Sequence, residues 1–236
     1  MMDATPFEGK SQQAYRELKR LILTLELAPG QLLHEPTLMN TLGCGRTPVR
    51  EAIQRLAAEK LVVARPRQTA FVASILAHEL AEIVEVRLVL EVPAARMAAE
   101  RGTNQERDRL RAACESFREH ARAGDGEGIL AGDAAIHSLI ASMSRNSFLV
   151  EYSERLASVS QRVWWLSVQD VSHDDAFIRC HDDLTMTICS GDAEAAAITA
   201  VDHVALFQTR LGRLVQAVSP DIRPSERVSR QPSTAA

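Results

Sequence analysis

The stretch CGRTPVREAIQRLAAEKLVV (Cys44–Val63) decides the fold of the N-terminal part of the chain. Its apolar residues recur at spacings of three and four and so share one side of a helix, these being Val49, Ile53, Leu56 and Ala57. Another side carries the polar and basic residues Arg46, Thr47, Arg50 and Gln54. Pro48 suits the first turn, where its missing N–H costs no intrahelical bond, and Gly45 or Thr47 is the expected N-cap. We predict a helix that buries one face and presents a basic face at its first turns, as a helix that enters a DNA groove must.

The flanking segments decide between a DNA-reading face and an ordinary solvated one. Upstream, the apolar pattern from Ala14 to Leu25 predicts an amphipathic helix that stops at Ala28-Pro29-Gly30, and a short helix is expected over 35–42. Downstream, the runs 61–65 and 69–73 are rich in β-branched and apolar residues and predict a two-stranded hairpin. Three helices and a hairpin in this order constitute a winged helix-turn-helix.

This segment resembles the N-terminal domain of the GntR family of bacterial transcription regulators. The matching residues are Pro29-Gly30, Leu32, Leu38, Leu42-Gly43, Arg46 to Ala52, Arg55-Leu56 and Leu61-Val62. Four positions depart from the family pattern: Met39 replaces the usual Ala, Gly45 the usual Ser, Lys60 the usual Gly, and Gln68-Thr69 the usual Arg-Gly of the wing. The resemblance implies that Arg46, Thr47, Arg50 and Gln54 contact base edges or phosphates of operator DNA.

The charge of the chain is unevenly distributed. The 236 residues carry a net charge of −4, but residues 1–75 hold 10 Lys/Arg against 7 Asp/Glu, whereas the rest holds 17 against 24. A basic N-terminal part and an acidic remainder suit a protein that orients on a polyanion. No run of eighteen apolar residues and no secretory signal is present, and the four cysteines show no CxxC spacing, so we expect a cytoplasmic protein without a membrane partner or disulfides.

The second part of the chain is helical throughout by pattern. Helices are expected over 78–101, 104–123, 129–144, 146–168, 173–190 and 192–218, with breaks at Gly, Asn and Asp residues. We therefore expect a mostly α protein: a winged helix-turn-helix DNA-binding domain (1–75), an all-α antiparallel helical bundle for effector binding and dimerisation (76–218), and a disordered Pro/Ser/Arg-rich tail (219–236). The order of landmarks resembles the FCD subgroup of the GntR family, whose effector domain is such a bundle.

Asp133 and His137 lie four residues apart and so project from one face of one helix, where they can share a cation. His181 and His203 lie on two later helices at spacings compatible with the bundle interior. These four positions match the metal ligands of the FCD domain, so the resemblance implies a divalent cation, and Zn²⁺, Ni²⁺, Mn²⁺ and Fe²⁺ all suit one Asp and three His. Arg87 and Arg162 are candidates to pair with the carboxylate of a small organic acid, the alternative being surface ion pairs.

These observations favour a ligand-responsive transcription regulator over the other classes. We expect a repressor that binds a near-palindromic operator as a homodimer, each copy reading one half of the site. A metal-dependent enzyme is the rival class, but no residue near the four ligands is distinguished as base or nucleophile, so we assign no catalytic residue. A regulator that senses the metal itself is the third possibility.

Overall fold

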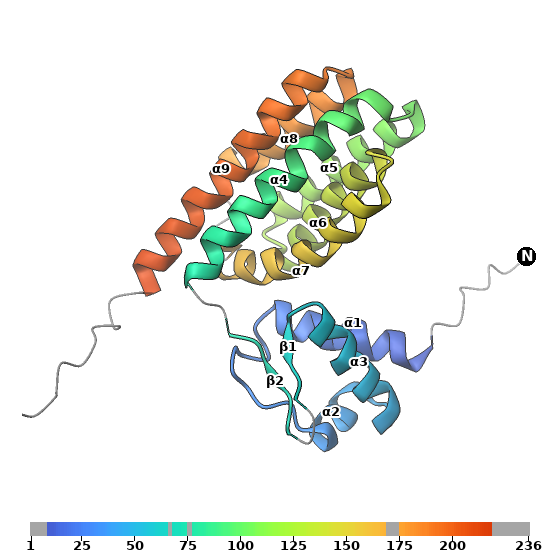
Figure 1. Cartoon of the computed structure of the whole chain (residues 1–236), viewed down its shortest axis with the longest axis vertical. Coiled ribbons are helices and arrows are strands. Elements are labelled where there is room, and N and C mark those ends of the chain that lie inside the picture. The colour runs from blue at the N-terminus through green and yellow to red at the C-terminus, as the bar shows by residue number, and fades with distance from the viewer. Residues whose placement is uncertain (1–8, 66–67, 75–76, 169–174, 219–236) are drawn as a thin grey trace, which may run out of the picture.

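A computed structural model describes residues 9–65, 68–74, 77–168 and 175–218 of the chain (Figure 1). Three short helices and a two-stranded sheet come first, and longer helices follow. The elements are α1 (Lys10–Leu23), α2 (Glu35–Leu42), α3 (Arg46–Ala58), β1 (Val62–Val63), β2 (Phe71–Val72), α4 (Ala77–Arg101), α5 (Asn104–Ala123), α6 (Gly126–Met143), α7 (Ser147–Val168), α8 (Asp175–Ser190) and α9 (Ala193–Val218).

The N-terminal unit confirms the predicted winged helix-turn-helix. Helix α3 packs against α1 and α2 through its apolar side, where Val49 and Leu56 are fully buried. Strands β1 and β2 are antiparallel, with Val62 opposite Val72, and Leu32 forms a further bridge to Phe71. The hairpin is thereby attached to the segment that precedes α2, which holds the wing beside α3.

The end of α1 differs from the prediction because a non-glycine residue adopts a left-handed backbone conformation. Helix α1 ends at Leu23 rather than at Ala28, since Leu25 has a φ of 61° and the chain turns back to let the Leu27 N–H donate to the Leu21 carbonyl. After α3, Lys60 has a φ of 60°, at the position where the family usually has Gly. This backbone conformation costs an L-residue about 1–2 kcal/mol, which explains the usual preference for Gly there. The strands are also shorter than the predicted runs 61–65 and 69–73.

The remaining helices form the predicted bundle. Helix α4 lies along α9 over much of its length, α5 packs on α6, and α8 on α9 (Figure 1). Thr103 begins α5 with a capping box to Glu106, and Gly124 ends it at a φ of 68°. Helix α6 begins at Gly126, before the predicted residue 129, because the Asp125 side chain accepts the Gly128 N–H and caps the helix. The helix breaks expected from Gly, Thr and Asp are thus where the bundle turns.

Some predictions fall on residues that the structure does not describe. The tail 219–236, predicted to be disordered, and residues 75–76 at the expected domain boundary lie outside the described residues. Among the helices that are described, none combines the length and the apolar character needed to span a membrane.

Candidate nucleic-acid interface and metal centre

The outer side of α3 presents all four residues predicted to contact DNA. Gly45 is the N-cap, which settles the choice between Gly45 and Thr47, and the helix buries its apolar side against α1. The side chains on the outer side are exposed, these being Arg46, Thr47, Arg50 and Gln54. The side chains of Arg46 and Arg50 retain 63% and 57% of their accessible surface, so neither guanidinium is locked inside the protein.

A carboxylate from α2 lies between these two arginines. The Nε of Arg50 donates to Oε1 of Glu35 at 2.8 Å, and the Nε of Arg46 lies 3.5 Å from Oε2 of the same residue. Glu35 is the first residue of α2 and follows the N-cap His34. The sequence analysis did not single out Glu35, because nothing in the spacing of α2 and α3 fixes which side chains meet between them.

A groove runs between α3 and the hairpin. Polar and basic side chains from both elements line it, among them Arg50, Gln54, Arg65 and Gln68. The predicted reading face therefore continues from the helix onto the wing, although Gln68 and Thr69 replace the usual Arg-Gly.

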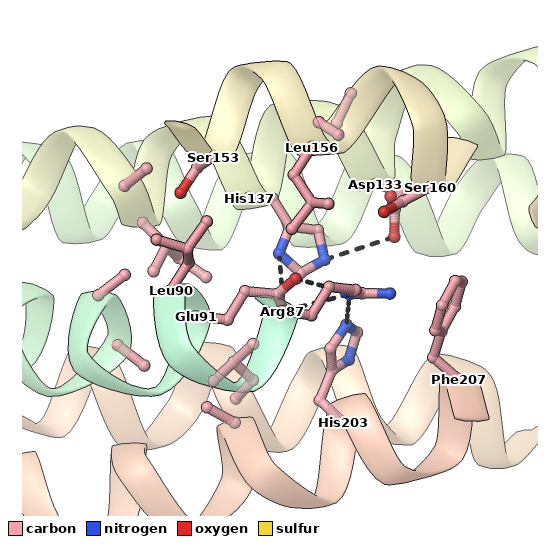
Figure 2. A pocket seen from close by; sticks show the side chains of 18 of the residues that line it. Arg87, Leu90, Glu91, Asp133, His137, Ser153, Leu156, Ser160, His203 and Phe207 are labelled. Atoms are coloured by element: carbon pink, nitrogen blue, oxygen red, sulfur yellow. Dashed lines mark hydrogen bonds and ion pairs between the residues drawn. The ribbon is translucent and has the colours of Figure 1, made fainter. Parts of the chain in front are cut away.

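In the bundle, the four predicted metal ligands come together from three helices. One ring nitrogen each of His137 (α6), His181 (α8) and His203 (α9) lies within 4.8 Å of the others. Oδ1 of Asp133, on α6, lies 3.0 Å from Nε2 of His181 and 3.6 Å from Nε2 of His137. Figure 2 shows Asp133, His137 and His203 directed toward one centre. The donor set and its convergence fit a divalent cation.

Hydrogen bonds and burial set the charges of this cluster. Nδ1 of His181 donates to the Phe177 carbonyl at 2.9 Å, which leaves Nε2 directed at Asp133. Burial alone would lower the pKa of His181, but its neighbours Cys180 and Asp133 raise it to about 10. Burial would raise the pKa of Asp133, but the adjacent His137 and His181 hold it well below its usual range. Burial, together with the positive charge around it, keeps the pKa of His203 well below the usual value. Asp133 is thus ionised and His203 neutral, as metal ligands must be, whereas His181 is protonated and would have to release a proton when a cation binds.

Arg87 is part of the same centre and is not a surface residue. Its side chain is almost fully buried, donates from Nε and Nη2 to the Glu91 carboxylate, and lies over the Phe207 ring with 4.2 Å to the centroid. Nη2 also donates to Nε2 of His203 at 3.2 Å (Figure 2). The alternative of a surface ion pair is therefore wrong for Arg87. Arg162 lies in α7, but its side chain is outside the described residues, so its role stays a prediction.

A cavity of about 60 Å³ adjoins the cluster. This space is on the order of four water molecules. Its wall is mostly apolar, with Leu90, Ile140 and Leu156 among the lining residues, and Arg87 and the histidine cluster supply charged and polar groups. The sequence analysis did not single out as site residues the polar lining residues Glu91, Ser153, Ser160, Gln161 and Cys180. The Sγ of Cys180 lies 3.4 Å from Nδ1 of His203, and the place of Cys180 directly before His181 was the available clue in the sequence.

Helix α7 also contacts the N-terminal unit through a set of hydrogen bonds, which we call the junction network (Tyr15, Lys19, Glu59 and Ser158). Lys19 donates to Glu59 Oε2 at 2.8 Å and to Ser158 Oγ at 2.7 Å, and Ser158 donates to Glu59 Oε2 at 2.9 Å. The Tyr15 hydroxyl donates to the other carboxylate oxygen of Glu59. Glu59 is the C-cap of α3, and Ser158 is buried. The network joins the C-terminal end of α3 to α7 of the bundle.

Comparison with known proteins places both regions in described families. A model of the FCD domain matches residues 82–206, and a model described as bacterial regulatory proteins, gntR family, matches residues 10–72. The matched segments contain the reading face in one case and the histidine cluster in the other.

Individual relatives are similar over most of their length. The probable D-xylose utilization operon transcriptional repressor of Paenarthrobacter nicotinovorans is 28% identical over 193 residues, which cover 80% of this chain and 84% of that protein. The HTH-type transcriptional repressor RspR of Escherichia coli (strain K12) is 26% identical over 199 residues, covering 84% and 87%. Among solved structures, E. coli McbR/YncC aligns with a TM-score of 0.78 at 24% identity, covering 88% of this chain and 99% of that chain, which indicates a shared fold.

Proposed function

Because the chain belongs to the GntR family of bacterial transcription regulators and carries an FCD domain, we propose that it is a repressor whose operator binding responds to a small organic acid. It is a DNA-binding transcription regulator and not an enzyme, since both matched domains are those of regulators. The observation that carries the proposal is the exposed row of Arg46, Thr47, Arg50 and Gln54 on a helix whose apolar side is buried. Two relatives named as repressors support this direction of control.

We propose that the protein reads DNA as a homodimer. The polar edge of a single α3 covers only a few base pairs, so two copies related by a two-fold axis would read the two halves of a near-palindromic operator. The net negative charge of the whole chain disfavours strong binding through phosphates alone. Base contacts from the α3 helices of the two copies would then supply most of the discrimination between DNA sequences.

We propose that Asp133, His137, His181 and His203 hold one divalent cation. The convergence of the three imidazoles and the ionised Asp133 carboxylate support this assignment. Zn²⁺, Ni²⁺, Mn²⁺ and Fe²⁺ remain the candidates. The cation, when bound, would supply positive charge for the carboxylate of the effector. Nε and Nη2 of the buried Arg87 are engaged by Glu91 and His203, so Nη1 of the guanidinium would donate to the same carboxylate. The small cavity favours a compact acid with a short apolar body.

The response of the DNA-binding domain (1–75) to the effector domain (76–218) needs a physical connection, and α7 offers one. Leu156, Ser160 and Gln161 line the cavity, whereas Ser158 on the same helix takes part in the junction network. A ligand that shifts α7 would therefore change the hydrogen bonds made by Glu59 at the end of α3. Such a shift couples the two sites only if the ligand prefers one position of α7 over the other.

Replacing Glu59 by Gln is expected to lower the free energy of unfolding at pH 7 by about 1–2 kcal/mol, because charge-assisted hydrogen bonds are lost. Burial raises the pKa of Glu59, but the hydrogen bonds from Lys19 and Tyr15 outweigh it and hold the pKa below its usual value. The contribution of the carboxylate is thus present above the unfolded-state pKa of about 4.3 and is lost as the pH falls through the lower folded-state pKa. Urea unfolding at pH 7 and at lower pH measures this, and the difference between wild type and variant should shrink below about pH 4.

The exposed Glu85 on α4 provides the control for this experiment. Glu85→Gln removes the same charge outside the junction network and should leave the unfolding curve nearly unchanged. Equal stability of Glu59→Gln and Glu85→Gln at pH 7 would show that the network does not join the two units energetically.

Selection of bound duplexes from a random library tests the proposed function directly. We expect wild-type protein to enrich a near-palindromic sequence whose half-sites lie one helical turn or a multiple of it apart. Operator binding is then measured after treatment with a chelator and again after zinc is restored. Enrichment of no sequence would contradict the assignment, whereas full binding after chelation would exclude a metal-sensing role and leave the cation as part of the acid site.

A further inference from the structure

Glu35 is an acidic residue that lies beside two arginines of the basic reading face. Its carboxylate contacts the Nε atoms of two arginines that lie one turn apart on α3, at 2.8 Å for Arg50 and 3.5 Å for Arg46. Both arginines are exposed, and the Glu35 side chain retains 30% of its accessible surface. The carboxylate therefore lies at the border of the surface that faces a duplex.

The position of Glu35 is fixed by its own helix. It is the first residue of α2, where a negative charge is favoured by the helix dipole, and Pro36 follows it in the first turn. Leu33 and Leu38, on either side in the sequence, are buried in the core. The carboxylate is consequently held by a rigid element rather than by a loose surface loop.

The atoms that Glu35 engages restrict how Arg50 can bind a base. A guanidinium offers donors from Nε and from two Nη groups, and a guanine accepts two of them at O6 and N7. Since Nε of Arg50 is used by Glu35, the two Nη groups remain for such a contact. A guanidinium oriented in this way presents one defined edge to the groove.

The carboxylate also reduces the positive charge available to phosphates. Two arginines and one glutamate together carry one net positive charge at this site. Sequence-independent binding depends on the number of phosphates that basic groups neutralise, so a nearby carboxylate weakens it. A correct base contact is affected less, because its energy comes from directed hydrogen bonds.

We propose that Glu35 is a specificity-determining residue of the reading face, which orients Arg50 and Arg46 for base contacts and weakens binding through phosphates alone. The proposal rests on the proposed function, namely that α3 reads operator DNA. It assigns to a residue outside the recognition helix a direct influence on which DNA is bound.

The test uses the full-length protein, the duplex that wild-type protein enriches from a random library, and a scrambled duplex of the same length. Fluorescence anisotropy gives both dissociation constants at several salt concentrations for wild type, Glu35→Gln and Glu35→Ala. Glu51→Gln is the matched control, since Glu51 is an exposed acid on α3 that makes no contact with Glu35 in the described hydrogen bonds and ion pairs. Glu51→Gln changes the net charge by the same amount as Glu35→Gln. Circular dichroism verifies that each variant keeps its helices.

We expect the ratio of scrambled to specific dissociation constants to fall at least about tenfold in Glu35→Gln, with tighter binding of the scrambled duplex and a steeper dependence on salt. Glu35→Ala should lower the ratio further, because it also removes the acceptor for Nε. Glu51→Gln should keep the wild-type ratio. An unchanged ratio in both Glu35 variants, or the same change in Glu51→Gln, would overturn the proposal. A wild-type protein with no sequence preference would overturn the proposed function and this proposal together.

Discussion

Replacing Arg50 by Ala is expected to abolish specific operator binding while the fold stays intact. Arg50 lies on the outer side of α3 with 57% of its side-chain surface accessible, so its removal leaves no cavity in the core. A good bidentate base contact is worth about 1–3 kcal/mol, and a homodimer loses two of them, which amounts to about 2–6 kcal/mol or roughly 30-fold to 10⁴-fold in affinity. Electrophoretic mobility shift with the selected duplex measures the loss.

Arg109→Ala is the control for Arg50→Ala. Arg109 is an exposed residue of α5 in the bundle, and its removal lowers the net charge by the same amount. We expect it to leave operator affinity close to that of wild type. If Arg50→Ala binds the operator as tightly as Arg109→Ala does, α3 does not read the sequence, and the recognition surface must lie elsewhere.

The second large effect is expected at the histidine cluster. His203→Ala should lower the affinity for zinc at least about 100-fold, because loss of a direct ligand exceeds the 10–100-fold effect typical of residues that only support a ligand. Competition with a chelating dye measures the affinity, and elemental analysis of purified protein measures the occupancy. Because His203 is buried in the core, Asp133→Asn serves as a second variant that removes the charge but keeps the shape.

The exposed His120 provides the comparison for the metal experiment. It lies at the end of α5 and bonds Asp125, away from the cluster. His120→Ala should bind zinc as wild type does. Equal zinc affinity for His203→Ala, Asp133→Asn and His120→Ala would show that the three imidazoles serve another purpose, such as orienting Arg87 through its contact with His203.

The exposed polar face of α3 could be predicted from the sequence because it depends on local geometry. Spacings of three and four in one helix decide which residues are buried with Val49 and which are exposed with Arg50. Helix breaks at Thr103 and Gly124 were predicted for the same reason, since capping is a property of neighbouring residues. The predicted end of α1 was wrong because Leu25 adopts a left-handed backbone conformation, which leucine disfavours.

Contacts between segments that are far apart in the sequence could not be predicted from residue spacing. Asp133 and His137 share a helix face, but His181 and His203 were added by resemblance to a known domain, and the structure brings the four side chains together. Ser158 and Glu59 are 99 positions apart, so nothing local indicates that they share a hydrogen bond. Cys180 was missed because a thiol in a helix reads as a small apolar residue until its neighbours are known.

Helix α7 contacts both the cavity and the N-terminal unit, and this matters for the construction of hybrid regulators. Adjacent positions of this helix border the cavity, as Ala157 does, and the N-terminal unit, as Ser158 does. A chimera that joins the effector domain of a relative to the DNA-binding domain of this protein would replace both surfaces of α7 at once. In such a chimera, DNA binding should respond to the effector only when the α7 of the relative has a small hydroxyl residue at the position of Ser158, opposite Glu59. In a chimera that does not respond, that position is the first to restore to Ser.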